Sequence, residues 1–326
     1  MRKHIWKLAL AAVIMIGAGW TLLILASSEL RQGPTPILFV PKTMDKRIEF
    51  WQVLMQGMNS AAKEYDAEIQ VVGPDSESDI DGQIHILENV LTEKPKVMIL
   101  AANDYEKVVP AAQKIKATGT QLITVDSGLD SNAATSFIAT DNYEAGIKAG
   151  RTIQQLVSGK ATIAVMNTVN GSATAMERER GLRDSLKDAK DIHLIDTHYN
   201  GGLGDLSYAY TQELLRQRND IDGFVCLNES STVGVSRAMK DLMMKNMKVV
   251  GFDSSMYEIS FLEEGILQAT VVQKPFNMGF LAVEAAVKAY KGEKISSRID
   301  TGSEVITKNN MYTKENQKLL FPFVEK

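Results

Sequence analysis

Short apolar segments alternate with amphipathic segments along most of the chain, and this alternation restricts the possible folds more than any other feature of the sequence. The first repeat is Ile37–Val40, followed by a segment that places Phe50, Leu54 and Ala61 on one helical face. Further strand-like runs are Ile69–Val72, Val97–Leu100, Leu122–Val125, Phe137–Ala139, Thr162–Met166, Ile192–Asp196, Ile221–Leu227, Lys248–Phe252 and Leu267–Val272. Because strands that alternate with helices of about 10 to 15 residues form parallel sheets covered on both faces, the pattern predicts an α/β fold.

The stretch from Gln121 to Gly146 predicts that the chain passes from one sheet to a second one. Leu122–Val125 ends at Asp126, and the next short strand is followed by Asp141, which supplies N-cap chemistry for a helix. The strand and helix pattern then restarts without a long linker. We therefore expect two doubly wound parallel-sheet lobes joined by a multi-strand hinge. The expected ranges are 29–36 for a linker, 37–140 with 274–300 for the first lobe, and 141–273 with 301–326 for the second.

The first 28 residues carry a membrane-targeting pattern. Arg2, Lys3 and Lys7 precede Leu8–Ala26, an uncharged and almost wholly apolar run of 19 residues. A spanning helix needs about 20 apolar residues and the core of a signal peptide about 7 to 15, so the run favours an uncleaved anchor with the remaining chain outside the cell membrane. Small residues up to Ser28 also allow cleavage there, which would give a secreted or periplasmic protein.

Composition and motif searches argue against several classes of function. The net charge of -4 and the lack of basic patches give no reason to expect a nucleic-acid partner. None of the four histidines lies in a metal-ligand spacing, and no nucleophile-elbow or Walker motif occurs. We therefore predict a protein that is not an enzyme and uses no metal or cofactor. The lone cysteine, Cys226, lies in an apolar run that favours a buried and inert thiol.

Polar side chains follow five of the predicted strands and form a candidate ligand site. The carboxyl ends of parallel strands face the crevice in which an open α/β sheet binds its ligand. The residues at these ends are Asn103 and Asp104, Asp126, Asn228 and Glu229, Asp253, and Gln273. Each alone could be a helix cap or a turn residue. Arg178 either points into this crevice or pairs with glutamates on a solvated face, and Phe50 and Trp51 either stack on a ligand or pack in the core.

Taken in order, these motifs resemble the bacterial periplasmic sugar-binding proteins of the ribose- and xylose-binding group, from about Ile37 to about Lys294. The matching motifs are Phe50-Trp51 with Gly57, Ile123–Asp126, Ala139–Asn142 including Asp141, Glu177-Arg178 with Gly181, Asn228, Val250–Asp253, and Val272-Gln273 before Pro275. The resemblance implies a type I periplasmic binding protein fold. It implies that sugar hydroxyls are bound by Asp126, Arg178, Asn228, Asp253 and Gln273, and that aromatic rings near Phe50-Trp51 cover the sugar ring. Asn103 and Asp141 complete the set of expected ligand residues.

Departures from the ribose pattern leave the identity of the sugar open. Ser127 stands where ribose binders carry an arginine, and the loop from Pro41 to Arg47 is longer and more basic, with Lys42 as a possible extra donor. A different pentose, a hexose or a modified sugar would fit equally.

The resemblance and the amino-terminal run together imply a membrane partner. Membrane-anchored members of the family act as co-receptors of a sensor histidine kinase, and this is the function we expect. The alternative is the substrate-binding component of a sugar ABC transporter. A hydrolase that uses Asp126 and Asp253 as an acid/base pair has no second feature in its favour. A transcription regulator would need a helix-turn-helix where the apolar run lies.

Overall fold

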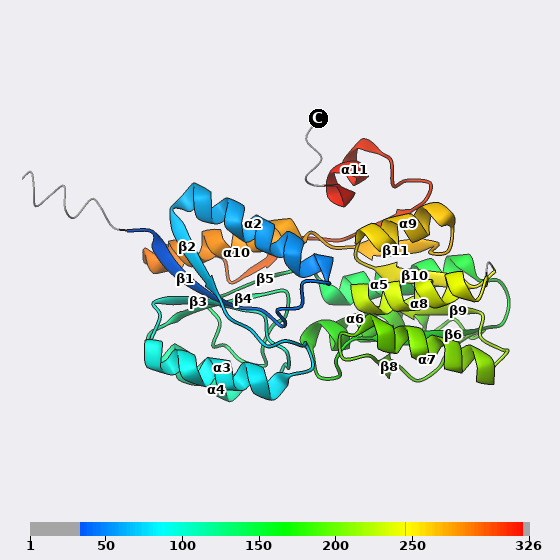
Figure 1. Ribbon diagram of the computed structural model, residues 1–326, viewed down its shortest axis with the longest axis horizontal. Coiled ribbons are helices and arrows are strands. Elements are labelled where there is room, and N and C mark those ends of the chain that lie inside the picture. Colours follow the sequence, from blue (N-terminus) through cyan, green and yellow to red (C-terminus); the bar gives the residue numbers. More distant parts are fainter. Residues whose placement is uncertain (1–32, 245, 322–326) are drawn as a thin grey trace, which may run out of the picture. The chain divides into compact units, whose positions relative to one another are not determined.

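The computed structural model describes residues 33–244 and 246–321, and the residues from Pro36 onward form one compact unit. A six-stranded sheet organises its first lobe (Figure 1). The strands are β1 (Thr35–Val40), β2 (Ala67–Val71), β3 (Val97–Leu100), β4 (Gln121–Val125), β5 (Ser136–Ala139) and β12 (Arg298–Asp300). They lie in the order β12-β5-β4-β3-β1-β2.

The strands of this sheet send alternate side chains into two cores, because successive residues of a strand point to opposite faces. Ile37 and Phe39 of β1 pack in the core formed with α2 (Glu49–Tyr65) and α10 (Pro275–Tyr290). Leu38 and Val40 pack in the opposite core, with α3 (Ile80–Glu93) and α4 (Val109–Ala117). Both faces of the sheet are therefore covered, with α2 and α10 above it and α3 and α4 below it in Figure 1.

A second sheet organises the second lobe. Its strands are β6 (Ala161–Asn167), β7 (Ile192–Leu194), β9 (Gly223–Cys226), β10 (Lys248–Phe252), β11 (Ala269–Val272) and β13 (Glu304–Thr307), with the two-residue β8 (His198–Tyr199) paired to β6. They lie in the order β13-β11-β10-β9-β6-β7. The part β11-β10-β9-β6-β7 corresponds to β5-β4-β3-β1-β2 of the first lobe. Only the edge strand of this sheet, β13, runs antiparallel to its neighbour among the described residues.

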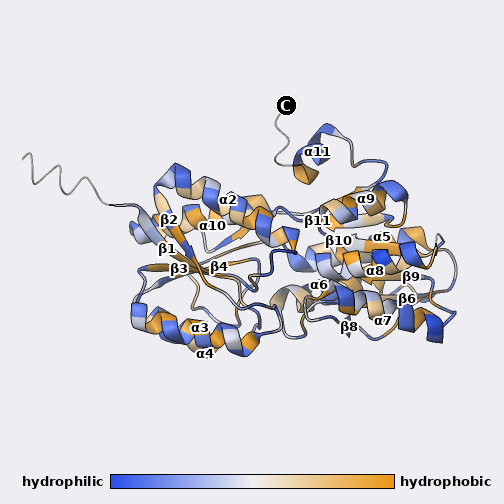
Figure 2. Ribbon diagram, in the orientation of Figure 1, coloured by the Kyte–Doolittle hydropathy of each residue, from blue (hydrophilic) through white to orange (hydrophobic). Residues whose placement is uncertain are grey.

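Helices cover both faces of the second sheet as well. They are α5 (Asn142–Leu156) and α6 (Ala173–Leu186) on one face, and α7 (Gly204–Gln217), α8 (Glu229–Asp241) and α9 (Met256–Glu264) on the other, followed by α11 (Lys314–Leu320). The helices mix hydrophilic and hydrophobic residues around their surfaces (Figure 2), as expected for elements with one buried face. Cys226 is buried in the core under α8, and burial raises the pKa of its thiol well above the ordinary value.

The prediction of an α/β fold with two parallel-sheet lobes is confirmed. The chain crosses between the sheets after β5, after β11 and after β12, and we keep the predicted lobe ranges as a proposed division. The sequence did not indicate β8, β12, β13 or α11. These are short elements, and β12 and β13 are edge strands that lack a repeated apolar pattern. The predicted amino-terminal anchor or signal helix lies outside the described residues; within the described ranges, no helix is long and apolar enough to cross a membrane.

Candidate binding site between the lobes

A small cavity of about 30 Å³ lies between the two lobes, at the carboxyl ends of their strands. Residues of the first lobe that line it are Lys42, Ile48, Phe50, Trp51, Glu77 and Asp126. Residues of the second lobe that line it are Thr168, Thr174, Arg178, Asn228, Glu229 and Asp253, and Gln273 follows β11 at a crossing between the lobes. Both lobes therefore contribute charged, polar and aromatic side chains to one site.

Asp126 and Asp253 occupy equivalent positions in the two lobes. Each directly follows a central strand, β4 or β10, and each has a left-handed backbone, with φ of 61° and 77°. This conformation is uncommon outside glycine, but aspartate tolerates it better than most residues. The bend ends the strand and turns each carboxylate toward the shared cavity.

The two carboxylates have different partners. The Asp126 carboxylate forms an ion pair with Lys42, with Nζ and Oδ2 2.9 Å apart and both side chains buried. Asp253 accepts a hydrogen bond from Gln273 Nε2 at 2.8 Å and another from the backbone N–H of Glu229 at 3.0 Å. Burial raises the pKa of Asp253, while the Arg178 guanidinium and the Gln273 hydrogen bond act in the opposite direction. A carboxylate from each lobe is thus held in place by the protein itself.

Arg178 points into the protein rather than along a solvated helix face. Its Nε donates to Asn142 Oδ1 at 2.8 Å and its Nη1 donates to the carbonyl oxygen of Leu227 at 2.8 Å. The guanidinium lies 4.6 Å from the centre of the Phe252 ring. Burial lowers the pKa of Arg178, and the nearby carboxylates, led by Asp253, counteract that effect. Both hydrogen bonds leave the Nη2 amino group available for another acceptor.

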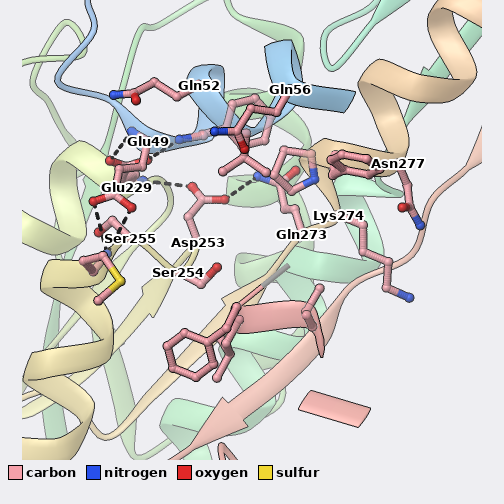
Figure 3. Close-up of a pocket in the computed structure, with 18 of the residues that line it drawn as sticks. Glu49, Gln52, Gln56, Glu229, Asp253, Ser254, Ser255, Gln273, Lys274 and Asn277 are labelled. Atoms are coloured by element: carbon pink, nitrogen blue, oxygen red, sulfur yellow. Dashed lines mark hydrogen bonds between the residues drawn. The ribbon is translucent and has the colours of Figure 1, made fainter. Parts of the chain in front are cut away.

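Gln273 carries a buried acceptor that the protein does not satisfy. The side chain is 2% exposed, and within the described part of the chain its Oε1 has no hydrogen-bond partner. Its Nε2 is fixed by the bond to Asp253, as Figure 3 shows. Since leaving a buried acceptor unpaired costs about 1 to 3 kcal/mol, this position is suited to a donor group of a ligand.

Phe50 and Trp51 pack in the core of the first lobe and also line the cavity. The two rings meet edge to face, with their centres 5.2 Å apart, and both are packed in the core of the first lobe. Both also line the cavity, where Trp51 Nε1 donates to Glu77 Oε1 at 3.0 Å. Asn228 also has two roles, because its Oδ1 caps α8 by accepting from the N–H of Ser231 while the side chain lines the cavity.

Asn103 and Asp141 are expected ligand residues that do not line this cavity, and neither does the candidate Asp104, whose Oδ1 accepts from the N–H groups of Glu106 and Lys107. Asn103 is buried behind it, where its Nδ2 donates to the carbonyl oxygens of Lys42 and Glu77 and so holds the loops that carry them. Asp141 caps α5 by accepting from the N–H of Glu144 at 3.0 Å, and it faces a separate cavity of about 490 Å³. The structure therefore brings together the remaining predicted residues, which are Phe50, Trp51, Asp126, Arg178, Asn228, Asp253 and Gln273.

Several lining residues were not among the predicted ligand residues. Glu77 and Thr168 lie in loops that carry no periodic pattern, and their side chains meet across the gap, with Thr168 Oγ1 donating to Glu77 Oε2 at 3.0 Å. Glu229 was a candidate because it follows a predicted strand, but the family resemblance gave it no role in binding. Lys42 was recognised only as a possible donor, and its Nζ bonds Ser172 and Thr174 of the other lobe at 3.2 and 3.0 Å.

A wider groove of about 790 Å³ adjoins the cavity and shares Phe50, Glu229, Asp253 and Gln273 with it (Figure 3). It continues past Lys274 toward α11. Within the ranges that the structure describes, no group of three or more His, Cys, Asp and Glu could hold a metal ion. The cavity and the groove therefore offer hydrogen-bonding and aromatic chemistry.

The fold and the cavity together define a two-lobed binding protein whose ligand site is shared between the lobes. Residues 37–294 match the family described as periplasmic binding protein domain. The chain belongs to this family, which confirms the resemblance to the type I periplasmic sugar-binding proteins.

Individual relatives support the same assignment. The ribose import binding protein of Haemophilus influenzae is 25% identical over 299 residues, which cover 92% of this chain and 98% of the relative. A sugar transporter structure from Clostridium phytofermentans is 41% identical, with a TM-score of 0.76 over 83% of this chain and 98% of that one. An ABC transporter solute binding protein from Agrobacterium vitis with bound D-fucose is 30% identical, with a TM-score of 0.84 over 88% and 100% of the two chains.

Proposed function

We propose that the protein binds one monosaccharide between its lobes and does not alter it. The observation that carries this proposal is the arrangement of Asp126 and Asp253, one from each lobe, around a cavity that also holds Arg178 and the unpaired Oε1 of Gln273. Carboxylates and the amide oxygen accept bonds from sugar hydroxyls, whereas the guanidinium donates in a fixed direction. The rings of Phe50 and Trp51 supply an apolar wall for the C–H side of a sugar.

Selectivity among sugars would arise from the cost of unpaired groups. A sugar that lacks a hydroxyl opposite Asp253 or Arg178 leaves a buried charge without its partner, and such losses cost about 1.5 to 3 kcal/mol each. Relatives include ribose-binding and D-allose-binding proteins, and similar proteins have been crystallised with D-arabinose and D-fucose. These names support neutral pentoses and hexoses as the first ligands to test.

The test is isothermal titration calorimetry of the full-length chain against neutral pentoses, hexoses and their derivatives. We expect one sugar per chain to bind. Asp253→Asn, which removes a charge but suits a left-handed backbone, should weaken the binding tenfold or more, or about 1.4 kcal/mol and above. Asp141→Asn is the matched control, because Asp141 caps α5 away from the cavity and asparagine also caps helices.

Two outcomes would contradict the proposal in different ways. If no sugar of the panel gave heat, the ligand class would be wrong. If a sugar bound equally well to wild type and Asp253→Asn, the ligand class would stand and the position of the site would be wrong.

The finer part of the proposal concerns the partner. We propose that the apolar run Leu8–Ala26 is an uncleaved anchor and that the lobes, held at the membrane surface, act as the co-receptor of a sensor histidine kinase. The run itself supports the anchor, because its 19 residues are close to the length that a spanning helix needs. The second candidate is the binding component of a sugar ABC transporter, which is favoured by the similarity to a ribose import binding protein and to an ABC transporter solute binding protein.

Crosslinking in native membranes separates these two candidates. The full-length chain is captured after crosslinking in the presence of its sugar, and its partners are identified by mass spectrometry. The proposal predicts a histidine kinase and retention of the chain in washed membranes. Recovery of a permease without a kinase would assign the protein to transport instead.

A further inference from the structure

The sequence contains two Asn-Gly pairs, Asn170-Gly171 and Asn200-Gly201. Asparagine is a thermolabile residue, and a glycine after it leaves the next backbone nitrogen accessible, because glycine has no Cβ and adopts a wide range of backbone angles. Such a pair can rearrange without an enzyme when the glycine nitrogen reaches the side-chain carbonyl carbon of the asparagine. The fold protects the two pairs to different degrees.

Asn170 is exposed and lies in a turn between β6 and α6. A hydrogen bond closes this turn, from the N–H of Ser172 to the carbonyl oxygen of Val169 at 3.2 Å. Within the ranges that the structure describes, no hydrogen bond holds the side-chain amide of Asn170 or the N–H of Gly171. Neither of the two groups that would react is therefore held away from the other.

The turn requires glycine at position 171. The φ of Gly171 is 98°, in the left-handed region that favours glycine, and a Cβ atom there would lie 2.6 Å from Asp104 Oδ2. A larger residue, which would hinder attack on the preceding amide, does not fit this turn. The geometry of the turn thus keeps in place the residue that makes Asn170 reactive.

Asn200 belongs to the same kind of pair in a protected setting. Its side chain is fully buried, and its Nδ2 donates to the hydroxyls of Ser207 and Ser231 at 2.8 and 3.0 Å. The N–H of Gly201 donates to the carbonyl oxygen of Thr168 at 2.8 Å. Because both reacting groups are bonded to other parts of the second lobe, this pair can react only after local opening.

We propose that Asn170 is a site of spontaneous deamidation, with water as the co-reactant. The Gly171 nitrogen loses its proton to solvent and attacks Cγ of Asn170. A bond forms between these two atoms, the bond from Cγ to Nδ2 breaks, and Nδ2 leaves as ammonia after taking up a proton. Water then opens the succinimide ring. Cleavage of the new bond at Cγ gives aspartate, and cleavage at the backbone carbonyl carbon gives isoaspartate.

The isoaspartate form changes the main chain beside the candidate binding site. Its backbone passes through the side-chain carbon atoms and is longer by one carbon atom, in a turn that lies between the cavity residues Thr168 and Thr174. The next residue but one, Ser172, is 1% exposed and precedes α6, and its Oγ accepts from Lys42 Nζ at 3.2 Å. A longer and newly charged turn should therefore loosen the start of α6. This chemistry involves the chain itself and does not depend on which ligand binds.

The test is peptide mapping by mass spectrometry of the full-length chain after incubation for several days at mildly alkaline pH. We expect Asn170 to convert at least about tenfold faster than Asn200, because Asn200 can react only in the small fraction of chains that have opened locally. In concentrated urea, which removes the fold, the two pairs should convert at similar rates. Asn170→Gln is the matched variant, since glutamine keeps the amide but cannot form the same ring, and it should show no conversion at position 170.

Hydrogen exchange measured by mass spectrometry tests the structural consequence. In the aged wild type, peptides from the first turn of α6 should exchange faster than before ageing, whereas peptides from α3 in the first lobe should not change. Aged Asn170→Gln should exchange as the fresh chain does.

Either of two mapping results would overturn the site. One is equal conversion of Asn170 and Asn200 in the folded chain. The other is an Asn170 that stays intact in the folded chain and converts only in urea. Unchanged exchange at the start of α6 in the converted chain would overturn the consequence for the binding site.

Discussion

Glu229 is a carboxylic acid that the fold keeps partly protonated near neutral pH. Burial, followed by the neighbouring charge of Asp253, raises its pKa to about 8, although the N–H groups of Phe50 and Glu49 lower it in part. In the unfolded chain the group returns to an ordinary value near 4.5. Between these two values the folded chain holds a proton that the unfolded chain has released, so the free energy of unfolding should fall as pH rises through this window.

This decrease of the free energy of unfolding with pH can be measured by urea denaturation at several pH values between about 5 and 8. Glu229→Gln, which stays neutral throughout, should have a smaller slope of unfolding free energy against pH than the wild type. Some slope should persist, because burial also raises the pKa of Asp253 and Glu258. Glu213→Gln serves as the control, since Arg216 lowers the pKa of that exposed residue and it titrates below the window. If the slope in Glu229→Gln equalled that of the wild type, the raised pKa of Glu229 would be contradicted.

At the scale of secondary-structure elements, two pairs of helices meet backbone to backbone at glycines. A Cβ atom placed on Gly57 of α2 would lie 2.0 Å from the carbonyl oxygen of Phe276 on α10. The equivalent pair in the second lobe is α5 with α6, where a Cβ on Gly146 would lie 2.1 Å from the carbonyl oxygen of Arg178. Because backbone atoms cannot give way as side chains do, any larger residue must push the helices apart.

Alanine at these two glycines should therefore have separable effects. Both Gly57→Ala and Gly146→Ala should lower the free energy of unfolding by about 1 to 3 kcal/mol. Only Gly146→Ala should also weaken ligand binding, because it displaces the segment that carries Arg178. Gly128→Ala is the control, since its Cβ would meet the Phe137 ring at an ordinary 3.5 Å. Chemical denaturation measures the free energy of unfolding and calorimetry measures the ligand affinity. If Gly146→Ala were as stable as the wild type, the close contact between α5 and α6 would be contradicted.

At the scale of the whole molecule, the arrangement of strands and helices could be predicted because burial on both faces of each sheet leaves a repeated apolar pattern. The same rule located Asp126 and Asp253, which directly follow central strands. Arg178 lies on a helix, so only the family motif predicted that it belongs to the site. Glu77 and Thr168 could not be predicted as lining residues, and Lys42 only as a possible donor, because all three lie in loops whose positions are set by contacts with the other lobe. Asp141 was included through its motif, but its side chain serves a helix end.

The matching left-handed bends at Asp126 and Asp253 have a mechanical consequence. Each lobe contributes part of the contacts around the cavity, so under the proposed function neither lobe alone can bind a small molecule tightly. The affinity then depends on the angle between the two lobes. Under the proposed function, a membrane partner that contacts both lobes would detect the bound sugar as a change in the angle between them, without contacting the sugar.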